Sequence, residues 1–255
     1  MAGMKFGLNL YSLREQISTK EDFLKTATRL KEMGYDFLQY SGGPWDPEMI
    51  REVSEQVGLP VVLTHVKLSQ MLEDAVKLTE EHRVFGCNNV GLGGFNTRSM
   101  PEDEILQGVS DIHRAARELT AAGAKFFYHN HHFDFQKLSD GRTIFEAVIE
   151  CPDVNVILDT FWLQAGGVAI LEYIDKLKGR IACVHLKDYM PTFNGKEFTP
   201  QFVPVGDGHI NWHDVIPAFL RAGAEHLIVE QDNATKCDDP FEQVARSIKY
   251  LKENF

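Results

Sequence analysis

The sequence predicts an α/β fold, a single (β/α)8 TIM barrel, from three observations. Short β-branched or aromatic runs alternate with longer stretches of helical period, as in βαβ units around a parallel sheet. Eight such units in 255 residues take roughly 30 residues each, the usual size for this barrel. The first strand lacks a Gly-x-Gly-x-x-Gly turn, which disfavours a doubly wound open sheet. We therefore expect one domain over residues 1–255, with its active site at the C-terminal ends of the strands.

The eight strands are predicted from the short apolar runs, taken in chain order. They are Lys5–Leu10, Asp36–Gln39, Pro60–Thr64, Asn89–Leu92, Lys125–His129, Val156–Leu158, Ile181–Leu186 and Leu227–Glu230. Helices are predicted between them; in Lys20–Met33, for example, apolar residues recur on one helical face.

Helix ends are predicted at glycines, because glycine adopts the left-handed conformation that turns the chain toward the next strand. These glycines are Gly34, Gly58, Gly86, Gly123 and Gly223. Helix starts are predicted at capping or first-turn residues. These are Thr19 or Ser18, Asp46, Pro101, Asp140 and Asn211.

Composition excludes several classes of partner. The chain has 26 Lys+Arg against 37 Asp+Glu, a formal net charge of −11, and no basic cluster, which disfavours nucleic acid. No apolar run is long enough to cross a membrane and no secretory signal precedes the first strand, so we expect a cytoplasmic protein. The four cysteines lie far apart without a Cys-x-x-Cys pair, which disfavours a zinc knuckle or a redox couple.

Three ionisable residues end three successive predicted strands. They are Asp159, His185 and Glu230, and His129 or His131 joins them from the strand before. Barrel geometry brings such residues together across the mouth, where two carboxylates and one or two imidazoles suit a divalent cation. We expect one such ion; Mn, Zn, Co, Fe and Mg all suit this ligand set.

Each of these residues also has a purely structural interpretation. Asp159 can cap the following helix, His185 can be a hydrogen-bonded core histidine, and Glu230 can be a solvated strand end. Their matching heights on consecutive strands favour the metal site over these separate explanations.

Other strand-end residues are candidates for contact with the substrate. Lys187 lies two residues beyond His185, on the same side of the chain, and is expected to hold a substrate oxygen or neutralise developing charge. The other candidate substrate-binding residues are Tyr11, His65, Asn130 and Trp162. The segment Tyr189–Gly208 is long for a loop after a strand, and we expect it to fold over the substrate.

Several segments resemble one known family along essentially the whole chain. They are Phe6–Glu15, Phe127–Phe135, Val184–Asp188, Val203–Trp212 and Val229–Asp232. These segments are similar to those of the xylose isomerase-like TIM barrels, broadly described as sugar phosphate isomerases/epimerases. The Tyr-His-Asn-His and His-Leu-Lys-Asp segments are similar to the branch near inosose dehydratases and enzymes that process 3-keto-sugars.

The resemblance implies a divalent metal held by one residue from each of strands five to eight. Asp159, His185 and Glu230 take three of these places. The fourth is commonly Glu in the epimerase branch, whereas this sequence has His129, with His131 two residues on, so the ligand and the acid/base are not distinguished. Gln39 replaces a Glu found in many relatives. Barrels of this branch often form dimers or tetramers, so a homo-dimer or homo-tetramer is expected.

The predicted reaction is proton abstraction next to the carbonyl of a keto-sugar or inosose, through a metal-stabilised enediolate. Glu230 or His131 is the candidate base, and Lys187 the third candidate catalytic residue. Isomerisation, epimerisation and elimination by a lyase or dehydratase share this first step. The alternatives are a zinc phosphodiesterase of the endonuclease IV type, which the acidic charge disfavours, and a non-catalytic sugar-binding barrel.

Overall fold

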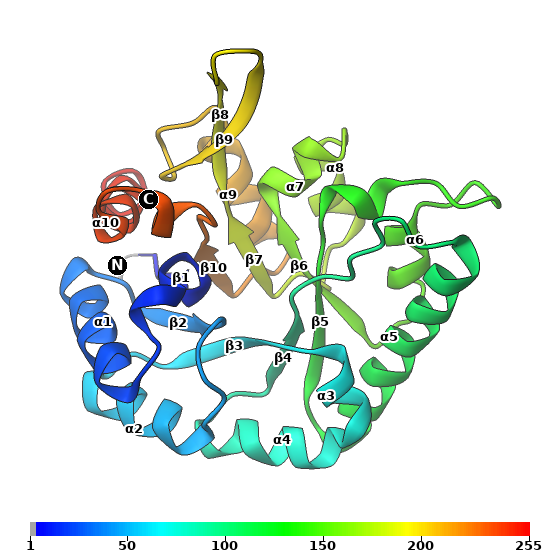
Figure 1. Cartoon of the computed structure of the whole chain (residues 1–255), viewed down its shortest axis with the longest axis horizontal. Helices are drawn as coiled ribbons and strands as arrows, with labels where there is room; N and C mark the ends of the chain where they lie inside the picture. The colour runs from blue at the N-terminus through cyan, green and yellow to red at the C-terminus, as the bar shows by residue number, and fades with distance from the viewer. Residues whose placement is uncertain (1–3) are drawn as a thin grey trace.

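Eight parallel strands form a closed barrel in the computed structural model, which describes residues 4–255 (Figure 1). Around the barrel the strands lie in the order β1-β10-β7-β6-β5-β4-β3-β2. Their bounds are β1 Phe6–Asn9, β2 Phe37–Tyr40, β3 Val61–Val66, β4 Asn89–Leu92, β5 Lys125–His129, β6 Val154–Asp159, β7 Cys183–Leu186 and β10 His226–Val229. The predicted fold class and all eight predicted barrel strands are confirmed, with ends that agree to within two residues.

Helices cover the outside of the barrel (Figure 1). Their bounds are α1 Lys20–Met33, α2 Pro47–Val57, α3 Leu68–Glu73, α4 Ala75–Val84, α5 Glu102–Ala122, α6 Ile144–Ile149, α7 Thr160–Ala165, α8 Ile170–Lys176, α9 Trp212–Arg221 and α10 Pro240–Asn254. Three short 3₁₀ helices are η1 Leu10–Gln16, η2 His132–Phe135 and η3 Ala234–Lys236. Within residues 4–255, no helix combines the length and apolar character that crossing a membrane requires.

The predicted helix ends follow the backbone chemistry of the sequence. All five predicted glycines have positive φ, from 67° at Gly58 to 102° at Gly34. Of the predicted starts, Thr19, Asp46, Pro101 and Asn211 are N-caps. Asp140 is not, because its Oδ1 accepts a hydrogen bond from the Arg142 amide in a turn.

The helix expected at Asp140 begins three residues later. There Thr143 and Glu146 satisfy each other's backbone amides in a capping box, a stronger start signal than the isolated aspartate.

The barrel interior explains where the polar residues of the mouth come from. An apolar layer fills it, made of Phe37, Leu63, Phe127, Ile157, Cys183 and Ile228. Side chains alternate between the two faces of a strand, so the residue two positions later also points inward. Those residues are Gln39, His65, His129, Asp159, His185 and Glu230. A polar layer therefore lies directly above the apolar layer, at the C-terminal ends of the strands.

The segment expected to be a long loop is an antiparallel hairpin. Strands β8 (Asp188–Phe193) and β9 (Phe198–Val203) pair with each other and rise from the end of β7 (Figure 1). The buried Asp188 carboxylate anchors the base, accepting hydrogen bonds from the Gly206 amide at 2.9 Å and from Trp212 Nε1 at 2.8 Å. Asp188 therefore fixes the segment that leads from the hairpin to α9.

Candidate metal centre

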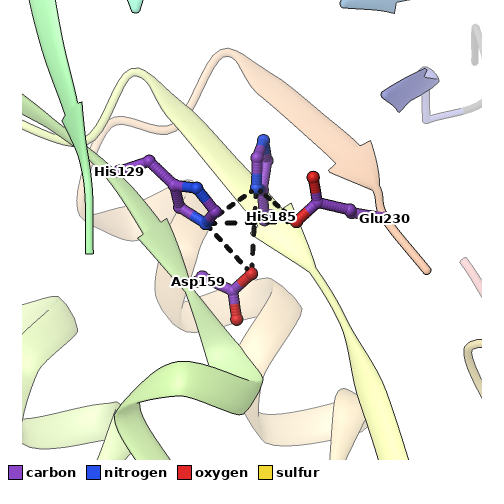
Figure 2. A group of neighbouring side chains, drawn as sticks. All are labelled: His129, Asp159, His185 and Glu230. Atoms are coloured by element: carbon purple, nitrogen blue, oxygen red, sulfur yellow. Dashed lines mark hydrogen bonds and ion pairs between the residues drawn. The ribbon is translucent and has the colours of Figure 1, made fainter. Parts of the chain in front are cut away.

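Four side chains from four neighbouring strands converge at the barrel mouth (Figure 2). His129 ends β5 and Asp159 ends β6, while His185 lies in β7 and Glu230 follows β10. One ligand atom of each lies within 4.8 Å of the others. All four residues are at most 3% exposed. The structure thus brings together the three residues expected from the sequence as metal ligands, Asp159, His185 and Glu230, with His129, one of the two candidates for the fourth.

The two imidazoles and two carboxylates face each other through defined atoms (Figure 2). His129 Nε2 lies 3.3 Å from Asp159 Oδ2 and 3.2 Å from His185 Nδ1. His185 Nδ1 lies 3.2 Å from Glu230 Oε2. Donor atoms this close can share one cation, because metal–ligand bonds of about 2.0–2.2 Å place ligands no more than about 4.4 Å apart.

Asp159 combines the structural and the chemical interpretation of its position. Its Oδ1 accepts the Trp162 amide at 2.9 Å and so caps α7, while Oδ2 faces the two histidines. Asn130, predicted to bind substrate, is fully buried, and its Oδ1 accepts the Asp159 amide at 2.9 Å. Asn130 therefore positions the end of β6 in this structure.

His129 and His131, which the sequence does not distinguish, occupy different positions. His129 belongs to the four-residue cluster, whereas His131 lies beside it, with ring centroids 4.6 Å apart. The His131 ring also packs against Phe133 at 5.1 Å and Trp162 at 5.0 Å. Its Nδ1 is buried without a hydrogen-bond partner in the protein. The geometry therefore places one histidine among the ligands and leaves the other free for a different task.

Two buried amides orient the cluster, and neither has a role assigned from the sequence. Gln39 Oε1 accepts from His185 Nε2 at 2.7 Å, which leaves Nδ1 of that ring as the atom facing the carboxylates. Asn9 Nδ2 donates to Glu230 Oε1, so Oε2 turns toward the cluster. The sequence does indicate their position, since both are inward-facing residues near the C-terminal end of a strand. It does not reveal the hydrogen-bond partner of either residue.

Lys187 lies against the cluster, fully buried. Its Nζ is 2.9 Å from Glu230 Oε2, 2.8 Å from Asp232 Oδ2 and 3.7 Å from Asp159 Oδ2. Burial raises the pKa of Asp159, but Lys187 and hydrogen bonds from the histidines outweigh it and hold that pKa well below its usual range. Lys187 and His185 likewise lower the pKa of Glu230, so both carboxyls are ionised.

The electrostatics of the cluster favour a bound cation. Burial alone lowers the pKa of His185, yet Glu230 and Asp159 raise it to about 9. Three carboxylates face the single ammonium of Lys187, so negative charge is in excess at a buried position. A divalent cation offsets this excess, and the mixed nitrogen and oxygen donors suit the first-row metals or magnesium. The residues present therefore fit a divalent metal ion.

A cavity of about 1070 Å³ opens beside the cluster. Tyr11, His65, His131, Lys187 and Glu230, all candidates from the sequence, line it. His65 Nδ1 lies 3.3 Å from Ser41 Oγ, and its Nε2 is buried without a partner in the protein.

Trp162 lies behind two of the lining residues. Its ring packs on His131 and lies 5.0 Å from Lys187 Nζ, and Phe202 of the hairpin covers the same ammonium at 4.9 Å. The hairpin therefore contacts the wall of the site and excludes water from Lys187.

The chain is similar in fold to several proteins of known structure. No curated protein sequence matches the chain. Among solved structures, a sugar phosphate isomerase/epimerase from Parabacteroides distasonis superposes with a TM-score of 0.82 at 22% identity, covering 100% of this chain and 95% of that one.

Two further structures share the fold at lower identity. A probable 3-DHS dehydratase from Bacillus anthracis has a TM-score of 0.72 at 14% identity, covering 99% of this chain and 100% of that one. An L-ribulose 3-epimerase has a TM-score of 0.69 at 13% identity, covering 97% and 93%. A family profile described as "Xylose isomerase-like TIM barrel" matches residues 27–254. The chain belongs to the xylose isomerase-like TIM barrel family.

Proposed function

We propose that this protein is a divalent-metal-dependent enzyme that removes a proton next to the carbonyl of a keto-sugar or inosose, as an isomerase, epimerase or lyase. The observation that carries the proposal is the buried cluster of His129, Asp159, His185 and Glu230, which opens into a cavity beside an unpartnered imidazole. A bound cation supplies positive charge that stabilises the oxygen on which negative charge develops. Binding alone does not require two carboxylates to converge in a buried place.

His131 is the proposed base. It lines the cavity, its Nδ1 has no partner in the protein, and Phe133 and Trp162 hold its ring in place. Burial holds the pKa of His131 well below its usual value, so the ring is neutral at neutral pH, which is the form in which a base acts.

Glu230, the other candidate base, is better suited to holding the cation. Its Oε1 accepts from Asn9 and its Oε2 from Lys187, so both oxygens are already occupied. A carboxylate stabilised in its ionised form by these donors is a weak base. We therefore assign Glu230 to metal binding.

Lys187 is proposed to neutralise the charge that develops on the substrate. Its ammonium lines the cavity and already lies within 3 Å of two carboxylates, so its position is fixed before the substrate arrives. Tyr11 and His65, which line the same cavity, are proposed to contact the sugar hydroxyls and ring face. Trp162 and Asn130 contribute by holding His131 and Asp159 in place.

Hydrogen–deuterium exchange tests the reaction directly. Metal-loaded protein is incubated in deuterated water with ketohexoses, inososes and 3-keto-glycosides, and mass spectrometry reads deuterium gained at carbon. We expect exchange with at least one class, and elemental analysis is expected to find about one divalent metal per chain. Metal binding without exchange on any of these compounds would favour the non-catalytic sugar-binding barrel.

The phosphodiesterase alternative finds less support. Among residues 4–255, one group of three or more His, Cys, Asp or Glu ligands lies close enough to share an ion. The net charge of −11 opposes a phosphate backbone. Cleavage of an abasic-site oligonucleotide by the metal-loaded protein would overturn the sugar assignment.

A further inference from the structure

The cavity extends well beyond the metal-ligand cluster. At about 1070 Å³ it lies just above the roughly 300–1,000 Å³ typical of pockets that hold drug-sized ligands. His129 and Glu230 of the cluster line one end, on β5 and just after β10. The other end, which we name the distal arm, is lined by residues at and beyond the ends of β2 and β3, namely Tyr40–Gly43, Trp45 and Val66–Gln70.

Glycine pairs create this space. Gly42 and Gly43 lie just beyond β2, while Gly93 and Gly94 follow β4, so these four positions carry no side chains into the cavity. A Cβ at Gly43 would lie 2.5 Å from the Tyr40 hydroxyl oxygen, and one at Gly94 would lie 2.7 Å from His131 Cε1. A larger residue at either position would therefore force Tyr40 or His131 to shift.

The walls of the distal arm are aromatic and nearly uncharged. Trp45 is held by a hydrogen bond from its Nε1 to Glu81 Oε2 at 2.8 Å and by packing on His82. Between the arm and the cluster, Tyr11 is 39% exposed, with the Arg14 guanidinium stacked 4.4 Å from its ring centre. Rigid aromatic faces of this kind suit the C–H face of a ring.

Lys67 is the one charged residue that lines the distal arm among residues 4–255. A phosphate group is usually bound by several donors that include Arg or more than one cation. Of the other two nearby cations, Lys187 is already paired with Glu230 and Asp232, and Arg14 Nη1 donates to the backbone oxygens of Tyr11 and Asp232. The arm therefore matches an uncharged group better than a phosphate ester.

We propose that the distal arm binds an uncharged second ring, so that the substrate is a glycoside or disaccharide whose oxidised ring lies at the metal-ligand cluster, rather than a free monosaccharide or a sugar phosphate. This inference rests on the proposed function, because it takes the cluster as the reacting end. It adds the size and charge of the part of the substrate that does not react.

Binding of non-reacting probes tests the arm separately from catalysis. Manganese-loaded protein is titrated by NMR with glucose, phenyl β-glucoside, cellobiose and glucose 6-phosphate. We expect phenyl β-glucoside and cellobiose to bind roughly tenfold or more tighter than glucose, since filling an apolar pocket by one or two groups gains about that factor. Glucose 6-phosphate is expected to bind no tighter than glucose. Tighter binding of the phosphate ester, or no gain from a second ring, would overturn the proposal.

A substitution that fills the distal arm tests the proposal in the protein itself. Ser69 is exposed and lines the arm without a role in the cluster, so Ser69→Trp places a bulky ring there. The control is Ser110→Trp on the exposed face of α5. We expect S69W to abolish the affinity gained from the second ring, while metal content and glucose binding stay unchanged. S110W is expected to leave all three unchanged. If S69W keeps the full gain, the second ring binds elsewhere and the proposal is wrong.

The two proposals fail in different ways. If no keto-sugar exchanges deuterium but S69W still removes the affinity gained from a second ring, the proposed reaction is wrong and the proposed binding role of the arm is supported. If exchange is seen with free 3-keto-glucose as fast as with phenyl 3-keto-β-glucoside, the proposed reaction is supported and the arm proposal is wrong.

Discussion

The two halves of the barrel mouth use equivalent positions for opposite purposes. In the half formed by β5, β6, β7 and β10, the inward residue at each strand end is ionisable and buried, giving His129, Asp159, His185 and Glu230. In the half formed by β1 to β4, the inward residues near the strand ends include the amides Asn9 and Gln39, and glycine pairs and aromatic residues lie beyond them. The same backbone geometry therefore supplies a charged reacting end on one side and open space on the other.

Gln39 is where the two halves meet. It lies in β2, in the open half, yet its Oε1 reaches across the mouth to His185 Nε2 at 2.7 Å. The open half thus also orients a residue of the charged half. Substitutions in each half test these separate roles.

Removing a ligand carboxylate is expected to have the largest effect. Asp159→Asn keeps an oxygen that can cap α7 but loses the charge facing the histidines. We expect metal affinity to fall by more than the roughly 10- to 100-fold typical of outer-shell changes, with activity lost in parallel. Elemental analysis and metal titration measure it, with Asp103→Asn on exposed α5 as the control. Full metal content in D159N would mean that the ion binds elsewhere.

Removing the proposed base is expected to have the second-largest effect. His131→Asn is expected to slow deuterium exchange by roughly 10²- to 10⁴-fold while metal content stays the same, because the ring lies beside the ligand set. His132→Asn is the matched control, since His132 neighbours His131 and stacks on Trp162 outside the cluster. Equal loss in both variants would show that packing around Trp162, rather than proton transfer, is affected.

Breaking the hydrogen bond between Gln39 and His185 is expected to have a smaller effect on metal binding. Gln39→Leu removes the acceptor for His185 Nε2, so metal affinity should fall by roughly 10- to 100-fold as the ring loses its fixed orientation. Gln39→Glu keeps an acceptor and is expected to bind metal at least as tightly as the wild type. Both affinities are measured by competition with a coloured chelator. Unchanged affinity in Q39L would leave the amide without an orienting role.

The open half has a buried histidine of its own, with a structural task. His82 Nδ1 donates to Leu78 O at 2.7 Å and Nε2 accepts from Thr64 Oγ1 at 2.8 Å. Burial lowers the pKa of His82 from 6.5 to about 4. The unfolded chain therefore takes up the proton first as the pH falls, so this contribution to stability is full above about pH 6.5 and declines toward pH 4.

The stability profile of a variant isolates that contribution. Between pH 6.5 and 4 the free energy of unfolding is expected to drop by up to about 3 kcal/mol on account of His82. His82→Gln, which keeps a partner for Thr64, should remove most of that slope. Urea unfolding of both proteins at several pH values measures the difference. Parallel profiles for the two proteins would assign the acid sensitivity to other groups.

Much of this architecture follows from local sequence signals. Gly34 and Gly58 end helices because left-handed backbone conformations cost glycine little, and Thr19 and Asp46 begin them because their oxygens accept from free amides. Helical and strand periodicity predict the eight units. Asp140 marks the limit, since a turn and a helix start use the same side-chain chemistry and only the competing capping box at Thr143 decides between them.

Sequence periodicity predicts the barrel and the residues that line its mouth, because strand alternation brings every second side chain to the same face. Which histidine joins Asp159, His185 and Glu230, and which donors orient them, depends on the tertiary structure. Those donors link Asn9 to Glu230 and Gln39 to His185, across separations of 221 and 146 residues. No local pattern predicts such pairings, since they arise only when barrel closure brings β1 beside β10 and β2 within reach of β7.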